Sequence, residues 1–300
     1  MDNPNNQSVD SHEQSAATVP QVSQAATRNK RRIVAGIAAA VSLVILAGIT
    51  ILLAISTGWL SRTDSSGNRK RIKLAKGVTL DMVKIEAGSF TMGDVLGNEN
   101  ETPHQVTITQ DYYLGKTEVT QAQWKAVKGN NPSYYKGDNL PVENVSWNDA
   151  MDFCDKLNSM GKAPEGYKFT LPTEAQWEYA ARGGEKSRGF KYSGSNDIGD
   201  VAWYEYNSRS KTHEVATKKP NELRLYDMSG NVWELCLDWY GAYSGDAVDP
   251  QGASIGSFRV YRGGGWDFSD SFCRSTSRIC SLPSIRNTFL GFRLALVPSQ

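Results

Sequence analysis

The sequence predicts an α+β domain with much irregular backbone, preceded by one hydrophobic segment long enough to cross a membrane. Only a few helix-start signals occur, and each opens a short helix. The stretches between them are rich in Gly, Asn, Ser and aromatic residues. A chain of 300 residues with 39 % hydrophobic side chains can bury the core of one large domain, so we expect one folded domain plus a membrane segment.

The hydrophobic segment covers residues 33–60 and contains no charged residue. It follows four basic residues, Arg28, Lys30, Arg31 and Arg32. About 20 apolar residues suffice for a transmembrane helix, and basic residues mark its cytoplasmic side. We therefore predict a disordered cytoplasmic tail over residues 1–32, a transmembrane helix over 33–60 and a periplasmic or extracellular C-terminal domain. A cleaved signal peptide is the alternative, although its apolar core is usually shorter.

The segment after the membrane span divides into a polar linker, residues 61–77, and a folded domain, residues 78–298, because strand-like alternation begins near Leu80. Three capping boxes indicate where short helices begin. Thr120, Ser146 and Thr173 are the expected N-caps, and the helices should cover residues 121–127, 147–158 and 174–182. Each helix carries a Trp, for which core packing is the simplest explanation.

Several function classes are disfavoured by charge and motif content. A net charge of +1 gives no sign of a nucleic-acid-binding face. Residues 252–256 match the Gly-x-Ser-x-Gly pattern of serine hydrolases, but that chain order needs a histidine downstream. The only histidines, His12, His104 and His213, all lie upstream. Their spacing also argues against a histidine-based zinc or iron site.

Residues 225–240, LYDMSGNVWELCLDWY, suggest a calcium site. The carboxylates of Asp227 and Glu234 flank a Ser-Gly-Asn turn that could point carbonyl oxygens inward. Calcium accepts six to eight oxygen ligands in flexible geometry. From spacing alone the alternative stands equally: the two carboxylates could cap turns or pair with arginines.

The four cysteines, Cys154, Cys236, Cys273 and Cys280, form no Cys-x-x-Cys pair, which disfavours zinc ribbons and thioredoxin-like chemistry. Outside the cytoplasm they could form two disulfides. Cys273 precedes Arg274, and nearby positive charge favours a reactive thiolate. A catalytic Cys273 is therefore one interpretation, and a bridged or buried Cys273 is the other.

The stretch around Cys273, residues 259–280, is dense in Gly and Arg. Its Gly263, Gly264 and Gly265 would let two backbone segments approach closely. We expect four arginines, Arg262, Arg274, Arg278 and Arg293, to pair with buried carboxylates and brace irregular loops.

Eight ordered motifs together carry a family resemblance: MVKIEAGSFTMGD, ETPHQVTI, GKTEVTQAQW, PVENVSWNDAMDFCDKLN, LPTEAQWEYAARGG, LYDMSGNVWEL, RVYRGGGW and GFRLA. In this order the chain resembles the formylglycine-generating enzyme family, also called the sulfatase-modifying factor domain, over residues 80–296. The resemblance implies a single C-type-lectin-like domain that is poor in regular secondary structure and often stabilised by calcium.

Carried over by position, the family's calcium site implies side-chain ligands from Asp227 and Glu234, and backbone carbonyl ligands from Gly230 and Val232. A second calcium site of the family has no counterpart here. The resemblance also suggests, as a hypothesis, a disulfide between Cys236 and Cys273.

Active members of the family bind copper(I) with two cysteines and use oxygen to convert a substrate cysteine to formylglycine. In this chain the second cysteine falls on Cys273, but the first falls on Phe268 and the active-site serine on Gly265. One thiolate cannot supply linear two-sulfur coordination, so copper binding is disfavoured unless Cys280 replaces the missing ligand.

We therefore expect a membrane-anchored, non-catalytic module that binds an unidentified protein or small-molecule ligand. The expected binding surface comprises Trp266, Asp267, Phe268, Asp270, Phe272 and Arg286, a mixture of aromatic, short polar and arginine side chains that suits adaptable recognition. Related domains of this fold serve as diversified ligand-binding proteins, and an envelope scaffold that docks on other membrane proteins is a related interpretation. The alternative function is a copper- and oxygen-dependent formylglycine-generating oxidase with Cys273 as its surviving ligand.

Overall fold

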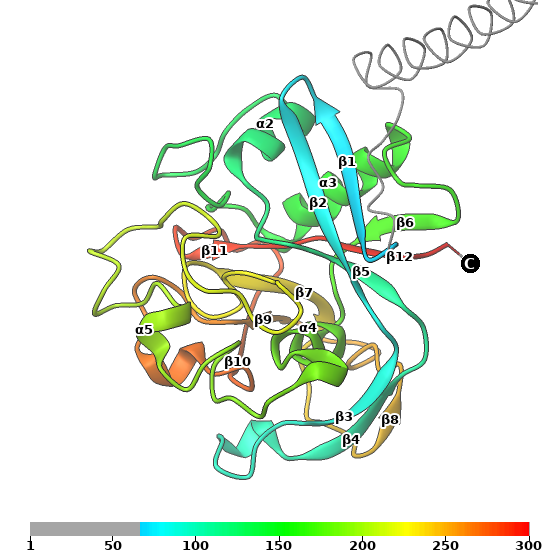
Figure 1. The fold of residues 1–300 in the computed structure, drawn as a ribbon, viewed down its shortest axis with the longest axis vertical. Coiled ribbons are helices and arrows are strands. Elements are labelled where there is room, and N and C mark those ends of the chain that lie inside the picture. The colour runs from blue at the N-terminus through cyan, green and yellow to red at the C-terminus, as the bar shows by residue number, and fades with distance from the viewer. Residues whose placement is uncertain (1–66, 300) are drawn as a thin grey trace, which may run out of the picture. The chain divides into compact units, whose positions relative to one another are not determined.

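The computed structural model of the chain describes residues 67–299 (Figure 1). The expected tail, residues 1–32, and the expected transmembrane helix, residues 33–60, lie outside the described residues. Within the described part, no helix has both the length and the apolar character needed to span a bilayer. The architecture below therefore concerns the C-terminal domain alone.

A five-stranded antiparallel sheet joins the two ends of this domain. Its order is β1-β2-β5-β12-β6, in which the last strand of the chain lies between two strands from the first half of the described residues (Figure 1). The strands are β1 (Arg69–Ala75), β2 (Val78–Ile85), β5 (Tyr112–Gly115), β12 (Ala295–Pro298) and β6 (Tyr167–Thr170). Strand β1 begins within the segment that the sequence assigned to a linker. The basic residues of β1 make it look like a linker, yet Ile72 and Leu74 alternate with them and are buried.

Two smaller sheets complete the β-structure. The four-stranded sheet, ordered β10-β9-β7-β11, consists of β10 (Arg278–Ser281), β9 (Arg259–Arg262), β7 (Trp233–Trp239) and β11 (Leu290–Gly291). The three-stranded sheet, ordered β3-β4-β8, consists of β3 (Gly88–Met92), β4 (His104–Ile108) and β8 (Ala247–Val248). The strands are short and the loops between them long, as the Gly-rich sequence predicted.

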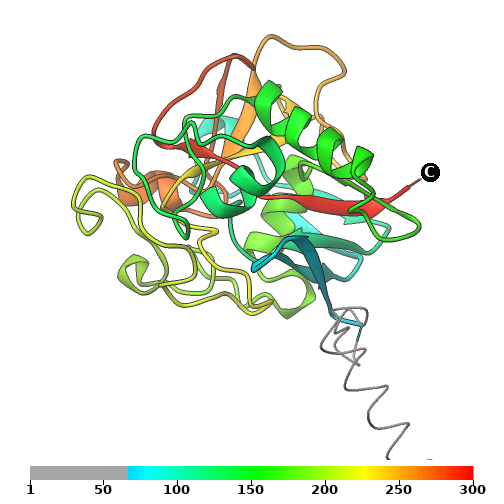
Figure 2. The same cartoon turned by 90° about the horizontal axis from the view of Figure 1, so that it is seen from above.

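The three predicted helices are confirmed, each with a complete capping box at the expected N-cap. They are α2 (Gln121–Lys128), α3 (Trp147–Ser159) and α4 (Glu174–Ala181), and a fourth, α5 (Ile198–Val201), has one turn. Three 3₁₀ turns also occur, η1 (Glu99–Glu101), η2 (Gly184–Lys186) and η3 (Asp270–Cys273). Helix α3 packs against β6, at one edge of the five-stranded sheet (Figure 2).

The five-stranded sheet lies between two hydrophobic clusters, and its side chains point alternately into one and the other. Tyr113 of β5 and Leu296 of β12 belong to the cluster that includes α2 and α3. Tyr112 and Leu114 of β5 face the other cluster, which includes α4. Both faces of the sheet are therefore covered, and Trp124, Trp177 and Trp233 are buried within the clusters, as expected for core residues.

The expected arginine–carboxylate pairs are all formed and brace the loops. Arg278 makes two 2.7 Å hydrogen bonds with Glu174, Arg274 makes two of 2.8 Å with Glu101, and Arg262 pairs with Glu178. Arg293 contacts both oxygens of Glu234 at 2.5 and 2.6 Å. Bidentate geometry makes such pairs directional, and they hold segments distant in sequence together.

Candidate functional site

The Gly triplet places β9 and the following loop against Cys273. Gly263 and Gly264 have φ angles of 97° and 78°, the left-handed region that favours glycine. A Cβ on Gly264 would lie 2.6 Å from the Sγ of Cys273 and 3.0 Å from its Cα. The sequence-based interpretation of close backbone approach is thus confirmed at this position.

Cys273 ends the 3₁₀ turn η3 and is fully buried. It packs in a small cluster with Tyr192 and Val201. Burial, assisted by the charge of Asp270, raises the pKa of the Cys273 thiol to about 12. At neutral pH the side chain is therefore a protonated thiol, and the adjacent Arg274 does not activate it because its guanidinium is held by Glu101.

An aromatic ring fills the position at which the family resemblance would place the second sulfur. Phe268 makes edge-to-face contacts with Trp233, Phe272 and Phe289, at ring-centroid distances of 5.4, 5.5 and 5.0 Å. Cys280 lies on a different element, β10, opposite Val260 of β9. The described residues thus provide no pair of sulfur ligands in this loop.

The expected disulfide between Cys236 and Cys273 is not formed in the structure, where all four cysteines are free thiols. The physical reason is that the two cysteines lie in different hydrophobic clusters. Cys236 belongs to the cluster beside α4, whereas Cys273 packs with Tyr192 and Val201. Two thiols held in separate clusters cannot reach the short Sγ–Sγ distance that a disulfide requires.

These positions predict a distinct pattern of thiol modification. In the native protein, Cys280 is partly exposed and should react with iodoacetamide, whereas Cys154, Cys236 and Cys273 are buried and should react only after unfolding. Mass spectrometry of the alkylated peptides measures both states. After unfolding without reductant all four should be labelled; resistance of Cys236 and Cys273 until reduction would show that the disulfide exists.

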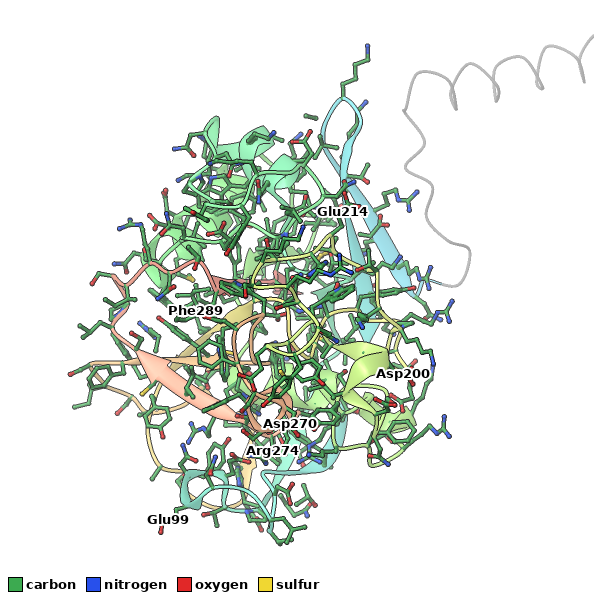
Figure 3. All side chains as sticks on the ribbon, turned by 90° about the vertical axis from the view of Figure 1, so that its left-hand side faces the viewer. Glu99, Asp200, Glu214, Asp270, Arg274 and Phe289 are labelled. Carbon is green, nitrogen blue, oxygen red and sulfur yellow. The ribbon has the colours of Figure 1, made fainter. Side chains whose placement is uncertain are left out.

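The expected binding surface is only partly brought together. Trp266 packs edge-on against Tyr135 at a ring-centroid distance of 5.6 Å and lies next in the chain to Asp267, an exposed residue whose carboxyl pKa is raised by desolvation. Phe272 is 37 % exposed beside Phe268, and Asp270 accepts a 3.0 Å hydrogen bond from the hydroxyl of Tyr192. Figure 3 labels Asp270 and Phe289 on this part of the molecule.

Arg286 does not join this cluster, because it pairs with Asp149 at the start of α3. Two groups that sequence reasoning missed do belong to it. Tyr134 is 70 % exposed next to Tyr135, and the backbone N–H of Glu205 bonds the carbonyl of Phe268. The adjacent tyrosines at 134 and 135 were the available signal, since aromatic side chains gathered on a loop are typical of recognition surfaces.

We call the residues that meet here the aromatic surface: Tyr134, Tyr135, Trp266, Asp267, Phe268, Asp270 and Phe272. Beneath it lies Glu143, whose Oε1 accepts a 2.8 Å hydrogen bond from the N–H of Tyr135 and whose Oε2 has no partner. Burial raises the pKa of Glu143 to about 7. The surface is therefore apolar and aromatic at its centre, with carboxyl groups at and below its edge.

The expected calcium ligands fit the structure only in part. Both oxygens of Glu234 are engaged, one by Arg293 and the other by Arg293 together with the indole N–H of Trp177. The guanidinium group of Arg293 thus lies where a calcium ion would have to contact the carboxylate of Glu234. Asp227 does fit, because its Oδ2 accepts from the N–H of Ala216 while its buried Oδ1 has no hydrogen-bond partner.

Glu118 is the acidic neighbour that sequence reasoning missed. It is fully buried, its Oε1 accepts from Asn231, and its Oε2 is unpartnered. Burial and the charge of Asp227 raise the pKa of Glu118, and burial raises the pKa of Asp227 to about 6. No group of three or more His, Cys, Asp or Glu side chains between residues 67 and 299 has metal-binding geometry.

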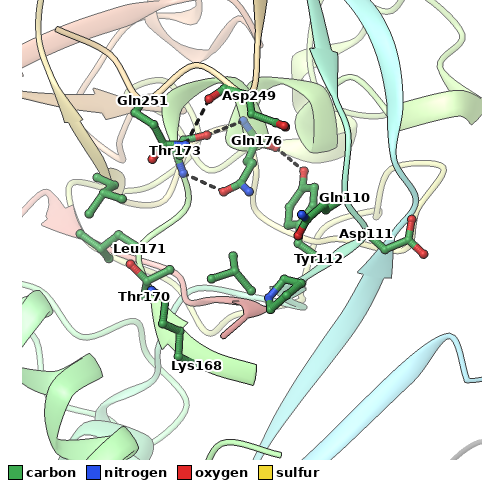
Figure 4. Close-up of a pocket in the computed structure, with 13 residues that line it drawn as sticks. Gln110, Asp111, Tyr112, Lys168, Thr170, Leu171, Thr173, Gln176, Asp249 and Gln251 are labelled. Atoms are coloured by element: carbon green, nitrogen blue, oxygen red, sulfur yellow. Dashed lines mark hydrogen bonds between the residues drawn. The ribbon is translucent and has the colours of Figure 1, made fainter. Parts of the chain in front are cut away.

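A separate cavity of about 530 Å³ lies between the five-stranded sheet and the start of α4 (Figure 4). Its lining mixes apolar, charged, amide and hydroxyl side chains, with Thr170, Gln176 and Gln251 among the residues drawn. The hydroxyl of Tyr112 donates to the carbonyl of Gln176, and Gln176 completes the cap of α4. These contacts give the cavity wall a structural role.

A family model supports the assignment that the fold and motifs indicate. The model described as sulfatase-modifying factor enzyme 1-like domain matches residues 72–297. The chain therefore belongs to this family, as the sequence motifs predicted.

Individual relatives agree. The chain is 34 % identical to the "Chaperone protein LppX" of Paenibacillus barcinonensis, covering 73 % of this chain and 87 % of that protein. It is also 34 % identical to the formylglycine-generating enzyme of Streptomyces coelicolor, covering 72 % and 89 %. Among solved structures, Treponema denticola variable protein 1 matches with a TM-score of 0.72 and 36 % identity, over 77 % of this chain and 99 % of that one. PvdO from Pseudomonas aeruginosa matches with a TM-score of 0.63 and 25 % identity, over 76 % and 97 %.

Proposed function

We propose that this protein is a non-catalytic binding module that recognises a protein or small-molecule ligand with its aromatic surface. The observation that carries the proposal is the replacement of a sulfur ligand by Phe268, together with the burial of Cys273 as a neutral thiol. Copper(I) requires soft thiolate ligands, and a protonated, enclosed thiol beside an aromatic ring does not meet that requirement.

The aromatic surface has the composition of a recognition site. Tyr and Trp supply large, rigid contact area at low entropic cost, while Asp267 and Asp270 supply hydrogen-bond acceptors. Tyr134 and Phe272 are exposed, whereas Phe268 and Trp233 form a packed base beneath them. The similarity to Treponema denticola variable protein 1 supports a binding role. A rigid frame below exposed loops lets the residues of the surface change without loss of the fold, which suits a protein that recognises ligands.

The membrane anchor is part of the same proposal. Residues 33–60 retain the length and apolar character of a transmembrane helix, and the basic residues before them favour a cytoplasmic N-terminus. A domain anchored in this way would present the aromatic surface in the periplasm or outside the cell.

Calcium is a further proposed component, with a changed ligand set. No N–H or hydroxyl donor reaches the buried carboxylate oxygens Asp227 Oδ1 and Glu118 Oε2, and the two side chains interact with each other. Calcium would supply the positive charge that this acidic pair lacks. Glu234 is excluded from this set because Arg293 holds it. A calcium ion here would tie the turn at residues 227–231 to the segment that precedes α2.

Photo-crosslinking in native membranes tests the binding role. A benzophenone amino acid replaces Tyr134 or Phe272 in the full chain, and Met160, 42 % exposed at the end of α3, serves as the matched control. We expect a discrete adduct from the first two positions and none from Met160. Equal adducts at all three positions would contradict a dedicated surface.

The alternative activity, oxidation of a substrate cysteine to formylglycine, is tested separately. Purified full-length protein in detergent is titrated anaerobically with copper(I), and a sulfatase-type cysteine peptide is then incubated with it in air. We expect no stoichiometric copper–thiolate complex and no loss of peptide thiol. Tight binding of one copper ion that is lost in Cys273→Ser would favour the oxidase function over the binding role.

A further inference from the structure

A second cavity, of about 210 Å³, lies at the N-terminal end of α4, away from the aromatic surface. Residues from several segments line it, among them His104 of β4, Glu174 of α4, Asp238 of β7, Tyr243 and Gly252 on either side of β8, and Arg278 of β10. Because liquid water occupies about 30 Å³ per molecule, the cavity has room for a ligand of several heavy atoms.

Asp238 is the feature that defines this cavity. Its side chain is only 3 % exposed, and Oδ2 accepts a 2.9 Å hydrogen bond from the N–H of Glu174. Oδ1 lies beside Gly252, where a Cβ would approach it to 2.9 Å. Asp238 lines the cavity, and none of the ion pairs formed within residues 67–299 involves its carboxyl.

The arginine in the cavity wall cannot serve as that counter-ion. Arg278 is bidentate to Glu174, and its remaining N–H groups bond the carbonyls of Gly241 and Asn100 at 2.9 and 3.2 Å. The hydroxyl of Tyr243 is directed to Glu174 at 3.3 Å. Glu174 and Arg278 cancel in charge. Arg259 also interacts with Asp238, but it forms no ion pair with it, because its guanidinium donates to the carbonyl of Leu237 and lies over the rings of Trp147 and Trp239. The carboxyl of Asp238 therefore has no direct ion-pair partner in the wall.

We propose that this cavity binds the ammonium group of a small primary aliphatic amine, with Asp238 as its counter-ion. An ammonium group brings both the positive charge and the three N–H donors that the wall lacks. Ala175, Met92 and Ala253 line the same cavity and offer apolar contact to a short alkyl chain. The proposal is independent of the binding role of the aromatic surface.

The protonation state of Asp238 predicts that amine binding is accompanied by a measurable release of protons. Burial, then the charge of Glu174, raises the pKa of Asp238 to about 8, and Arg278 opposes this effect. The charged and titratable groups that interact with Asp238 are Glu174, Arg278, Arg259 and the buried thiol of Cys236, and His104 and Tyr243 also line the cavity. At pH 7 the carboxyl therefore holds a proton that an arriving ammonium group must displace, so amine binding should release about one proton.

Isothermal titration of the full chain in detergent with propylamine tests this. Titrations at pH 7 in two buffers of different ionisation enthalpy give the number of protons released. We expect one site, release of close to one proton at pH 7, and an affinity that rises about tenfold from pH 7 to pH 9 as Asp238 ionises while the amine stays protonated. The neutral analogue 1-propanol should not bind.

Three variants show whether Asp238 and this cavity carry the binding. Asp238→Asn should abolish propylamine binding, and Asp246→Asn, an exposed acid on the same loop, should leave it unchanged. If Asp238→Asn does not fold, Ala242→Trp serves instead, because Ala242 is exposed at the cavity and a larger side chain there should block it. Equal binding of 1-propanol, binding without proton release at pH 7, or preference for calcium or potassium ions over the amine would overturn the proposal.

Discussion

Arg293→Met is expected to lower the free energy of unfolding by about 3–5 kcal/mol, because removing one partner of a buried ion pair leaves the other charge uncompensated. Arg293 is fully buried and bonds Glu234, the carbonyl of Gly115 and the carbonyl of Tyr226. Burial alone would lower the pKa of Arg293, but Glu234 raises it above its ordinary value, so the guanidinium stays charged. Urea unfolding of the full chain in detergent, followed by Trp fluorescence, measures the loss.

A matched control separates this effect from a general effect of arginine removal. Arg286 pairs with Asp149 at the surface, where an ion pair contributes about 0–1 kcal/mol. Arg286→Met should therefore shift the unfolding midpoint little. The double variant Arg293→Met/Glu234→Gln should recover part of the stability, since a neutral amide replaces the stranded carboxylate. A loss in Arg293→Met no larger than in Arg286→Met would contradict the bracing role.

Local signals in the sequence were enough to predict the helices. Thr120, Ser146 and Thr173 each start a helix because the cap involves residues only three positions apart. Strand pairing was not predictable in the same way. The position of β12 between β5 and β6 depends on contacts between residues about 130 and 180 positions apart, and no local pattern encodes them.

The candidate sites show the same division. Close approach at Gly264 and the arginine pairs followed from residue type, because glycine and arginine have few other uses at buried positions. The disulfide failed as a prediction because sequence gives no information on which cluster a cysteine enters. Glu118 was missed because it precedes Asp227 by more than 100 positions, and the cavity beside Asp238 is formed by several segments that lie far apart in the sequence.

Stability without calcium should fall as pH rises. A carboxyl whose pKa is raised by folding binds its proton more tightly in the folded state, so the free energy of unfolding decreases as pH rises from the unfolded pKa through the folded one. For Asp227 this pH window runs from 3.8 to about 6, and Glu118 extends the window to higher pH because its pKa is raised well above the ordinary value. Because the two carboxyls interact, the loss belongs to the pair, and each pKa unit by which folding raises it corresponds to about 1.4 kcal/mol.

Calcium should reverse this loss by replacing the protons at Asp227 and Glu118. Thermal unfolding in a chelator and in millimolar calcium, at pH 5 and at pH 8, gives the test. We expect calcium to raise Tm far more at pH 8, by an amount that corresponds to about 2.7 kcal/mol when calcium exceeds its Kd a hundredfold.

Variants locate that calcium effect. Glu118→Gln and Asp227→Asn should each remove most of the calcium response, because each deletes one of two carboxylate ligands that no arginine holds. Glu143→Gln is the control: burial also raises the pKa of Glu143, to about 7, so it contributes to the decline with pH, but it lies beneath Tyr135 and should leave the calcium response intact. The same Tm in chelator and in calcium at pH 8 would mean that protons alone satisfy Asp227 and Glu118.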